Sequence, residues 1–183
     1  MSESTLAPAA PVRAGGLLAA AWGILGVAAL LSNALERLAP MAGEALSGGQ
    51  FGAAHWVALA ACVGFMGFFE GYRAFQRGFC PRVVSRALHL AAHPRPLHVL
   101  LAPLYCMGLV HASRRRLTVS WSLTLGIVCL VVAVRMLAQP WRGIVDAGVV
   151  VGLGWGLVSL LALALRAAAG RPPEMAIELP AAR

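Results

Sequence analysis

The chain has 183 residues, of which 60% are hydrophobic and only 12% charged, and its formal net charge is +8. Soluble domains carry about 25% charged residues and are about half apolar, so this composition excludes an ordinary soluble domain and indicates an integral membrane protein. All the basic residues are arginines that border apolar runs. Anionic lipid headgroups and membrane topology therefore explain the charge better than nucleic acid does.

The N-terminal region predicts a tail followed by a membrane span. Residues 1–14 are rich in Ala, Pro and Ser and are predicted to be disordered. Residues 15–35 form the first apolar run of spanning length. Residues 32–34 offer a small-x-small cleavage site for a signal peptide, but the apolar run is longer than a usual h-region and only Arg13 precedes it. We therefore expect a retained helix.

The second span is predicted over residues 51–69, and its helix is expected to continue beyond the membrane surface. Glu70, Arg73 and Arg77 fall on one helix face, and Glu70 is expected to pair with Arg73. Gly78 is the predicted C-terminal stop. An interfacial aromatic belt is predicted at the same level from Phe68, Phe69, Tyr72 and Phe75.

Residues 81–93 predict a separate amphipathic helix. Pro81 suits a first helical position, and Pro94 discourages continuation. The polar side chains occupy one arc of roughly 100°, and apolar side chains fill the rest of the circumference. Such a helix is expected to lie in the headgroup plane on the cytoplasmic side. The polar arc consists of Arg82, Ser85, Arg86, His89 and His93.

Together these two helices predict a binding corner for an anionic headgroup or ligand. Its arginines could hold a phosphate or carboxylate by charge-assisted hydrogen bonds. The plainer interpretation is a topological anchor that grips anionic lipid. The candidate residues are Glu70, Tyr72, Arg73, Arg77, Arg82, Arg86, His89 and His93.

No metal site and no cofactor is predicted. His89 and His93 have the i, i+4 spacing of metal ligands, but no acidic residue lies between them and arginines share their face. The four cysteines show no CxxC or zinc-type spacing. His55 and His111 are candidate haem ligands, but their expected depths in the membrane disagree. A thiolate ligand at Cys80 has still weaker support.

Residues 97–112 form a short apolar segment that is predicted to be re-entrant or interfacial. Runs shorter than about 17 residues are usually not spans, and Pro103 lies at the centre of this one. If the segment does not cross, the arginines of 73–95 and 114–116 share one side with both termini. The positive-inside rule then makes this side cytoplasmic. We expect four spans in an inner (cytoplasmic) membrane, with five spans as the alternative.

The last two spans are predicted over residues 117–137 and 144–165, and residues 166–183 are predicted to be a loose tail. The expected fold is thus an all-α integral membrane protein with a single transmembrane domain over residues 15–165. It would be a four-span helical bundle with a cytoplasmic amphipathic helix and the short segment at 97–112.

The fourth span contains an intramembrane carboxylate, Asp146, and such groups are functional candidates by default. Arg142 lies four residues before it, and Arg135 lies across the preceding turn. We expect either an ion pair that fixes this hairpin or a relay for protons or ions. The same span carries small residues every four positions, which predict close helix packing, at Gly148, Gly152 and Gly156.

No nucleophile motif, P-loop, GxGxxG or paired-carboxylate array is present, and no resemblance to a known family is close enough to name. We therefore expect a non-catalytic subunit, assembly factor or lipid-contacting scaffold, with membrane lipids and either a membrane-protein partner or a second copy as its contacts. One alternative is a small transporter or channel that uses Asp146 with Arg135 or Arg142. Another is an interfacial enzyme or binder for an anionic lipid or polyprenyl phosphate, with Glu70, His89 and His93 for acid–base work.

Overall fold

The computed structural model describes residues 14–49 and 51–175, which form helices and turns without a strand. Four of these helices are long and apolar enough to cross a membrane. The prediction of an all-helical fold with four helices of spanning length is therefore confirmed. The predicted tail at 1–14, apart from Ala14, and the last part of the predicted tail at 166–183 lie outside the described residues.

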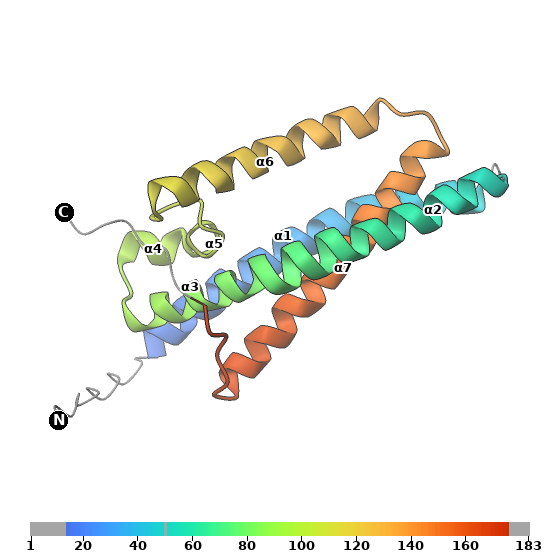
Figure 1. Ribbon diagram of the computed structural model, residues 1–183. Helices are drawn as coiled ribbons and strands as arrows, with labels where there is room; N and C mark the ends of the chain where they lie inside the picture. The colour runs from blue at the N-terminus through green and yellow to red at the C-terminus, as the bar shows by residue number, and fades with distance from the viewer. Residues whose placement is uncertain (1–13, 50, 176–183) are drawn as a thin grey trace, which may run out of the picture.

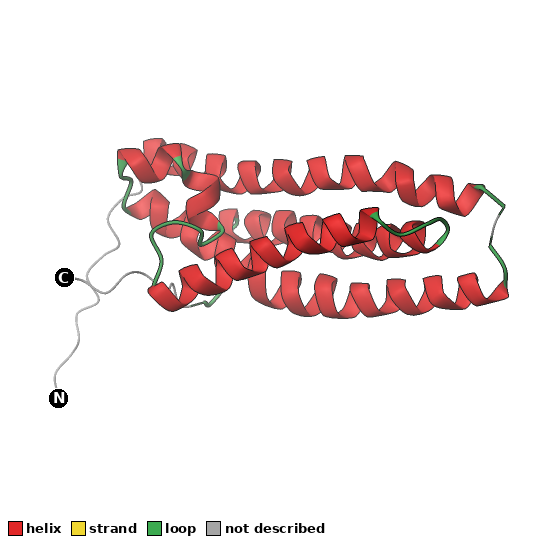
Figure 2. Ribbon diagram, turned by 90° about the horizontal axis from the view of Figure 1, so that it is seen from above, coloured by secondary structure: helices red, strands yellow, loops and turns green. Residues whose placement is uncertain are grey.

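The helices lie lengthwise in an elongated bundle (Figures 1 and 2). We call the end where the first helix begins the terminal end, and the opposite end the far end. The helices and their bounds are α1 (Ala14–Ser47), α2 (Ala53–Met66), η1 (Gly67–Phe79), α3 (Cys80–Ala92), α4 (Pro96–Leu100), α5 (Ala102–Cys106), α6 (Arg114–Arg135) and α7 (Trp141–Ala168). α1 and α6 run toward the far end, and α2 and α7 run back (Figure 1).

α2, η1 and α3 form one unbroken helix, so the prediction of a helix stop at Gly78 is wrong. Phe79 and Cys80 both have helical backbone angles, and the N–H of Cys80 bonds to the carbonyl of Phe75 in the π-helical pattern of η1. Pro81 lacks an N–H. We call the continuous helix formed by α2, η1 and α3 the long rod. Pro81 lies where the π-helical pattern returns to the α-helical one, so the long rod lacks one backbone hydrogen bond there but continues.

The amphipathic pattern over 81–93 predicted a helix on the bundle surface, but α3 is packed against other helices. It packs against α1, α5 and α7, and its buried residues include Val84, Ser85, Arg86 and Leu90. The backbones of α1 and α3 approach so closely that a side chain at Gly16 would collide with the carbonyl of Ala91. Ser85 and Arg86 at the centre of the polar arc are thus covered by protein, whereas Arg82 and His89 are half-buried and His93 is exposed.

The short segment 97–112 folds back against α1. It forms α4, α5 and a turn, and it is not among the four helices of spanning length. A side chain at Gly23 would meet Cys106 and Ala102, and one at Gly26 would meet Pro103. Gly23 is nine residues into α1, which places α5 about 14 Å along that helix from its beginning.

α7 is the central helix of the bundle and contacts α1, α2, η1 and α3. Its glycine stripe faces the long rod, where added side chains would meet Cys62 at Gly148, Glu70 at Gly152 and Phe75 at Gly156. At the far end, Gly143 lies directly against Ala45 of α1. The stripe therefore serves packing within this chain.

α6 lies apart from the other long helices (Figure 1). It touches α7 only weakly, and Trp121 donates a hydrogen bond through Nε1 to the carbonyl of Leu109, at 3.2 Å. Ser120 is the only buried residue of α6. Most of its large apolar side chains are exposed, as shown by Leu125, which is 64% exposed.

Candidate functional site

Arg86 ties α3 to the folded-back segment. Its Nε donates to the carbonyl of Tyr105 at 2.6 Å, and its Nη2 donates to the carbonyls of Val110 and His111 at 3.1 and 3.0 Å. The guanidinium carbon also lies 4.3 Å from the centroid of the Tyr105 ring. Because α5 ends at Cys106 and the chain then turns, the carbonyls of Val110 and His111 lie outside any helix. The carbonyl of Tyr105 also accepts a hydrogen bond from the N–H of Gly108, at 3.0 Å.

Four of the five histidines gather beside this arginine around Tyr105. The Tyr105 hydroxyl and His89 Nδ1 are 3.0 Å apart, and the ring of His98 stacks on the Tyr105 ring at 5.1 Å. The ring centroids of His98 and His111 are 4.3 Å apart, and His93 stacks on His89 at 4.8 Å. Desolvation and nearby positive charge lower the pKa of both His98 and His111. Both shifts favour the neutral form of the imidazole.

This cluster does not have the arrangement of a metal or haem site. Among the described residues, no group of three or more His, Cys, Asp or Glu side chains could hold a metal ion. His55 packs on Trp141 at the far end, at 5.1 Å, whereas His111 lies at the terminal end, so the two cannot ligate one haem. Cys80 is fully buried and donates its thiol to the carbonyl of Gly156.

The remaining residues of the predicted headgroup corner do not converge. They lie along one rod, and Glu70 and His89 are 19 residues apart, which is roughly 25–30 Å along a helix. Glu70 is directed at Gly152, whereas Arg73 is exposed, and the two form no ion pair within the described part of the chain. The predicted pair is therefore wrong, and Glu70 cannot share an acid–base site with His89 and His93.

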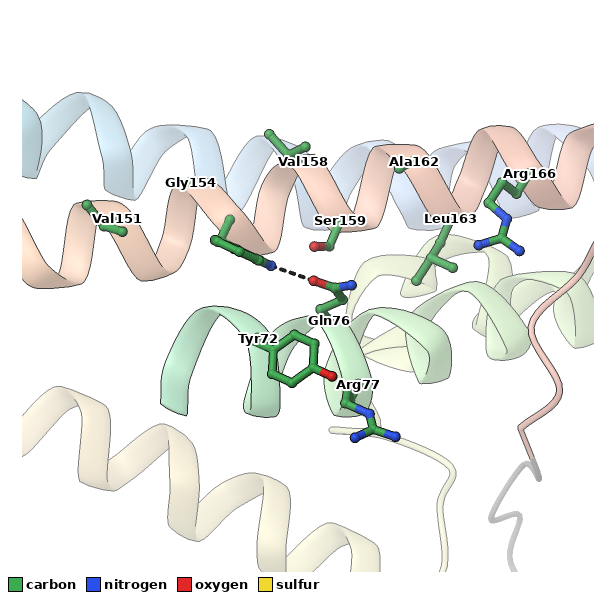
Figure 3. Close-up of a pocket in the computed structure, with 11 residues that line it drawn as sticks. Tyr72, Gln76, Arg77, Val151, Gly154, Val158, Ser159, Ala162, Leu163 and Arg166 are labelled. Carbon is green, nitrogen blue, oxygen red and sulfur yellow. Dashed lines mark hydrogen bonds between the residues drawn. The ribbon is translucent and has the colours of Figure 1, made fainter. Parts of the chain in front are cut away.

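A groove opens between η1 and the second half of α7 (Figure 3). Its volume is about 710 Å³. Trp155 donates through Nε1 to Gln76 Oε1 at 2.6 Å, and the Arg77 guanidinium lies 5.7 Å from the Tyr72 ring. Polar side chains reach the groove from both walls, and they are Tyr72, Gln76, Arg77, Ser159 and Arg166. Only Tyr72 and Arg77 of the predicted headgroup residues line it.

The polar residues predicted for the fourth span form a closed pair in α7 near the far end. Arg142 Nε and Asp146 Oδ2 are 3.7 Å apart, and this is the only ion pair within 14–49 and 51–175. Arg142 also contacts Met41 Sδ through Nη2, at 3.1 Å. Asp146 is 4% exposed. Arg135 is exposed at the end of α6 and does not join the pair.

Comparison with known proteins gives no further identification. No protein-family model, no curated protein and no solved structure matches this chain. The contacts and surfaces of the molecule itself therefore carry the functional inference.

Sequence reasoning missed the central role of Tyr105 and the groove residues Gln76, Ser159 and Arg166. The contacts around Tyr105 could have been predicted from a signal in the sequence. Pro103 and Gly108 flank Tyr105 and interrupt the apolar segment, and such interruptions leave backbone carbonyls that require a donor. The groove has no such signal, since its two walls are far apart in the sequence.

Proposed function

We propose that this protein is a non-catalytic subunit of a membrane assembly, in which α6 packs against a transmembrane helix of another chain. The observation that carries the proposal is the isolation of α6 from its own bundle. α7 contacts four other helical segments, whereas α6 contacts α7 only weakly and buries one residue, Ser120. A span with so little internal packing has its surface available for another helix.

α6 also carries the kind of surface that transmembrane helices use to associate. Thr118, Ser122 and Gly126 recur every four residues, and all three are exposed. A side chain added at Gly126 would meet nothing within 4 Å. Small residues at this spacing let two transmembrane backbones approach closely. The similar stripe of α7 is already covered by the rod of the same chain, so the α6 stripe is the one that remains open.

The side chains that could carry chemistry support a non-catalytic role. Arg86 holds three carbonyls, and Asp146 is paired with Arg142. Burial raises the pKa of the Cys106 thiol to about 12, which removes it as a thiolate nucleophile. These groups hold the fold together, and a proposed role in assembly does not require any of them to react.

We place the terminal end of the bundle in the cytoplasm and the protein in a cytoplasmic membrane. The support is the positive-inside rule, because Arg114, Arg115 and Arg116 begin α6 at this end and Arg166 closes α7 there. Cysteines introduced at Arg115 and at Gly43, both exposed positions, test it with an impermeant maleimide on intact spheroplasts. Gly43→Cys should be labelled and Arg115→Cys should not. The reverse pattern would overturn the orientation.

The assembly role is tested by crowding the α6 stripe. Tagged wild type, Gly126→Leu and Gly64→Leu would be purified from native membranes in mild detergent, and co-purifying membrane proteins quantified. Gly64, on α2, is a matched control because an added side chain there also meets nothing within 4 Å. We expect a stoichiometric partner or a second copy with wild type and Gly64→Leu, and about a tenfold loss with Gly126→Leu. A wild-type protein that purifies as a lone monomer would contradict the proposal.

A further inference from the structure

The groove between η1 and α7 differs along its length. Val151 and Trp155 line one end, and Arg166 lies at the other (Figure 3). Arg77 lines the groove from the opposite wall, and its guanidinium lies beside the Tyr72 hydroxyl and is directed away from α7 (Figure 3). An apolar compartment thus leads into one that carries two positive charges and several hydrogen-bond donors.

The direction of this gradient matches the membrane boundary. The apolar part of α7, residues 144–165, has 22 residues and is about 33 Å long, which is the thickness of a bilayer core. Arg166 is the first charged residue after this run. It therefore marks the headgroup level at the terminal end, and Val151 lies toward the middle of the membrane.

Within residues 14–49 and 51–175, no acidic group balances the charges of the groove. No carboxylate of these residues lines it, and Glu70, the acidic residue on the same wall helix, is directed at Gly152 instead. Arg77 and Arg166 form no ion pair within the described part of the chain. Gln76 is held by Trp155 through its carbonyl oxygen, which leaves its amide N–H groups available as donors. The site is therefore complementary to an anion that carries an apolar chain.

We propose that this groove binds one anionic phospholipid of the leaflet at the terminal end. The phosphate lies at the charged end of the groove, where Arg166 donates hydrogen bonds to it and Arg77 adds positive charge from the opposite wall. An acyl chain runs along Val158 and Trp155 toward Val151. The site assumes that the four long helices span the membrane, but it does not involve α6, so it can hold whether or not α6 binds a partner.

The test measures lipid retention by native mass spectrometry of the protein in a nonionic detergent. Phosphatidylglycerol and phosphatidylcholine with the same acyl chains would be added in separate titrations. We expect wild type to retain phosphatidylglycerol preferentially. Arg77→Gln and Arg166→Gln should each weaken its binding about fivefold, since one arginine near anionic lipid contributes about 1 kcal/mol. Equal retention of the two lipids by wild type would overturn the proposal.

Arg73→Gln is the matched control, because Arg73 is exposed on the same helix, carries the same charge and does not line the groove. An equal loss with Arg73→Gln would show diffuse attraction by surface charge and no defined site. Gly154→Leu tests the apolar part independently, since a side chain there meets no other group within 4 Å and extends into the groove. It should reduce lipid retention with all charges intact.

Two further measurements distinguish the lipid site from a soluble-anion site and from the partner surface of α6. Inorganic phosphate in excess should not displace the lipid, because phosphate lacks the acyl chain; displacement would assign the groove to a soluble anion. Gly126→Leu should retain phosphatidylglycerol as wild type does, so that failure of the α6 proposal and failure of the lipid site are distinguishable. Helical circular dichroism of each variant verifies that it is folded.

Discussion

Replacing Arg86 with Met should release the folded-back segment from α3. Arg86 is 5% exposed, and three of its hydrogen bonds join α3 to the backbone of residues 105–111. Met retains most of the apolar stem but has no donor. The substitution therefore removes the Arg86 donor from the carbonyls of this turn and preserves much of the packing, and the carbonyl of Tyr105 keeps its bond from the N–H of Gly108.

The magnitude follows from the burial of each acceptor. Tyr105 is 1% exposed, so water does not replace the bond from Arg86, and its carbonyl keeps only the bond from the N–H of Gly108. The lost hydrogen bond to a charged group contributes about 1.5–3 kcal/mol. Val110 is half-buried and His111 exposed, so solvent replaces much of their two bonds. Loss of the cation–π contact with Tyr105 adds about 1 kcal/mol. Removing the buried charge also removes its desolvation penalty, which offsets part of the loss.

We therefore expect the segment to lose about 3 kcal/mol against local opening, which is roughly a hundredfold in its opening equilibrium. Amide hydrogen exchange with mass spectrometry of peptides that cover residues 97–113 measures this directly. Peptides from α7 serve as an internal reference and should exchange as in wild type. Arg73→Met is the matched control, since Arg73 is exposed on the same rod. Unchanged exchange of 97–113 in Arg86→Met would refute the reasoning.

Three further predictions concern stability, pH and transport. Gly156→Ala should lower stability by about 1–3 kcal/mol in thermal denaturation, because its new methyl would lie 2.7 Å from the Phe75 ring; the open position of Gly64→Ala should show no loss, and equal effects would contradict the packing. Since the pKa values of His98 and His111 are lowered, the unfolded segment binds protons first. Exchange of 97–113, corrected for intrinsic rates, should therefore increase as the pH falls below about 6.5, and pH-independent opening would contradict this. Asp146→Asn should leave proton flux in liposomes unchanged, because Asp146 is a partner of Arg142 and not a relay; a wild-type flux that the variant abolishes would favour a transporter.

The four long helices could be predicted because apolar runs of spanning length are a property of local sequence, whereas their ends depend on tertiary contacts. The first span was expected to end at residue 35, but α1 continues to Ser47. Ala42 and Ala45 are buried beyond that point, and Ala45 lies against Gly143 of α7. Packing against α7 thus keeps α1 helical past the apolar run.

The helical wheel of residues 81–93 placed the polar residues on one arc, but it could not show what covers that arc. A helical wheel alone predicts that a polar helix face is exposed to solvent, because it contains no information about the rest of the chain. Here the acceptors of Arg86 come from residues 105–111, where α5 ends and the chain turns at Gly108. Gly108 has a positive φ of 75°, a conformation that favours glycine. The residues that cover the centre of the polar arc, 105–111, lie too far from Arg86 in the sequence for helical periodicity to reveal the contact.

The most direct test of the central claim is site-specific photocrosslinking in native membranes. A photoreactive residue at Ser122, on the open stripe of α6, should give a defined crosslinked product with a membrane protein or with a second copy of this chain. The same residue at Gly64, an exposed position on α2, should give only crosslinks to lipid. Crosslinks to lipid alone at both positions would contradict the account, because α6 would then be an ordinary lipid-facing span and not the contact surface of a subunit.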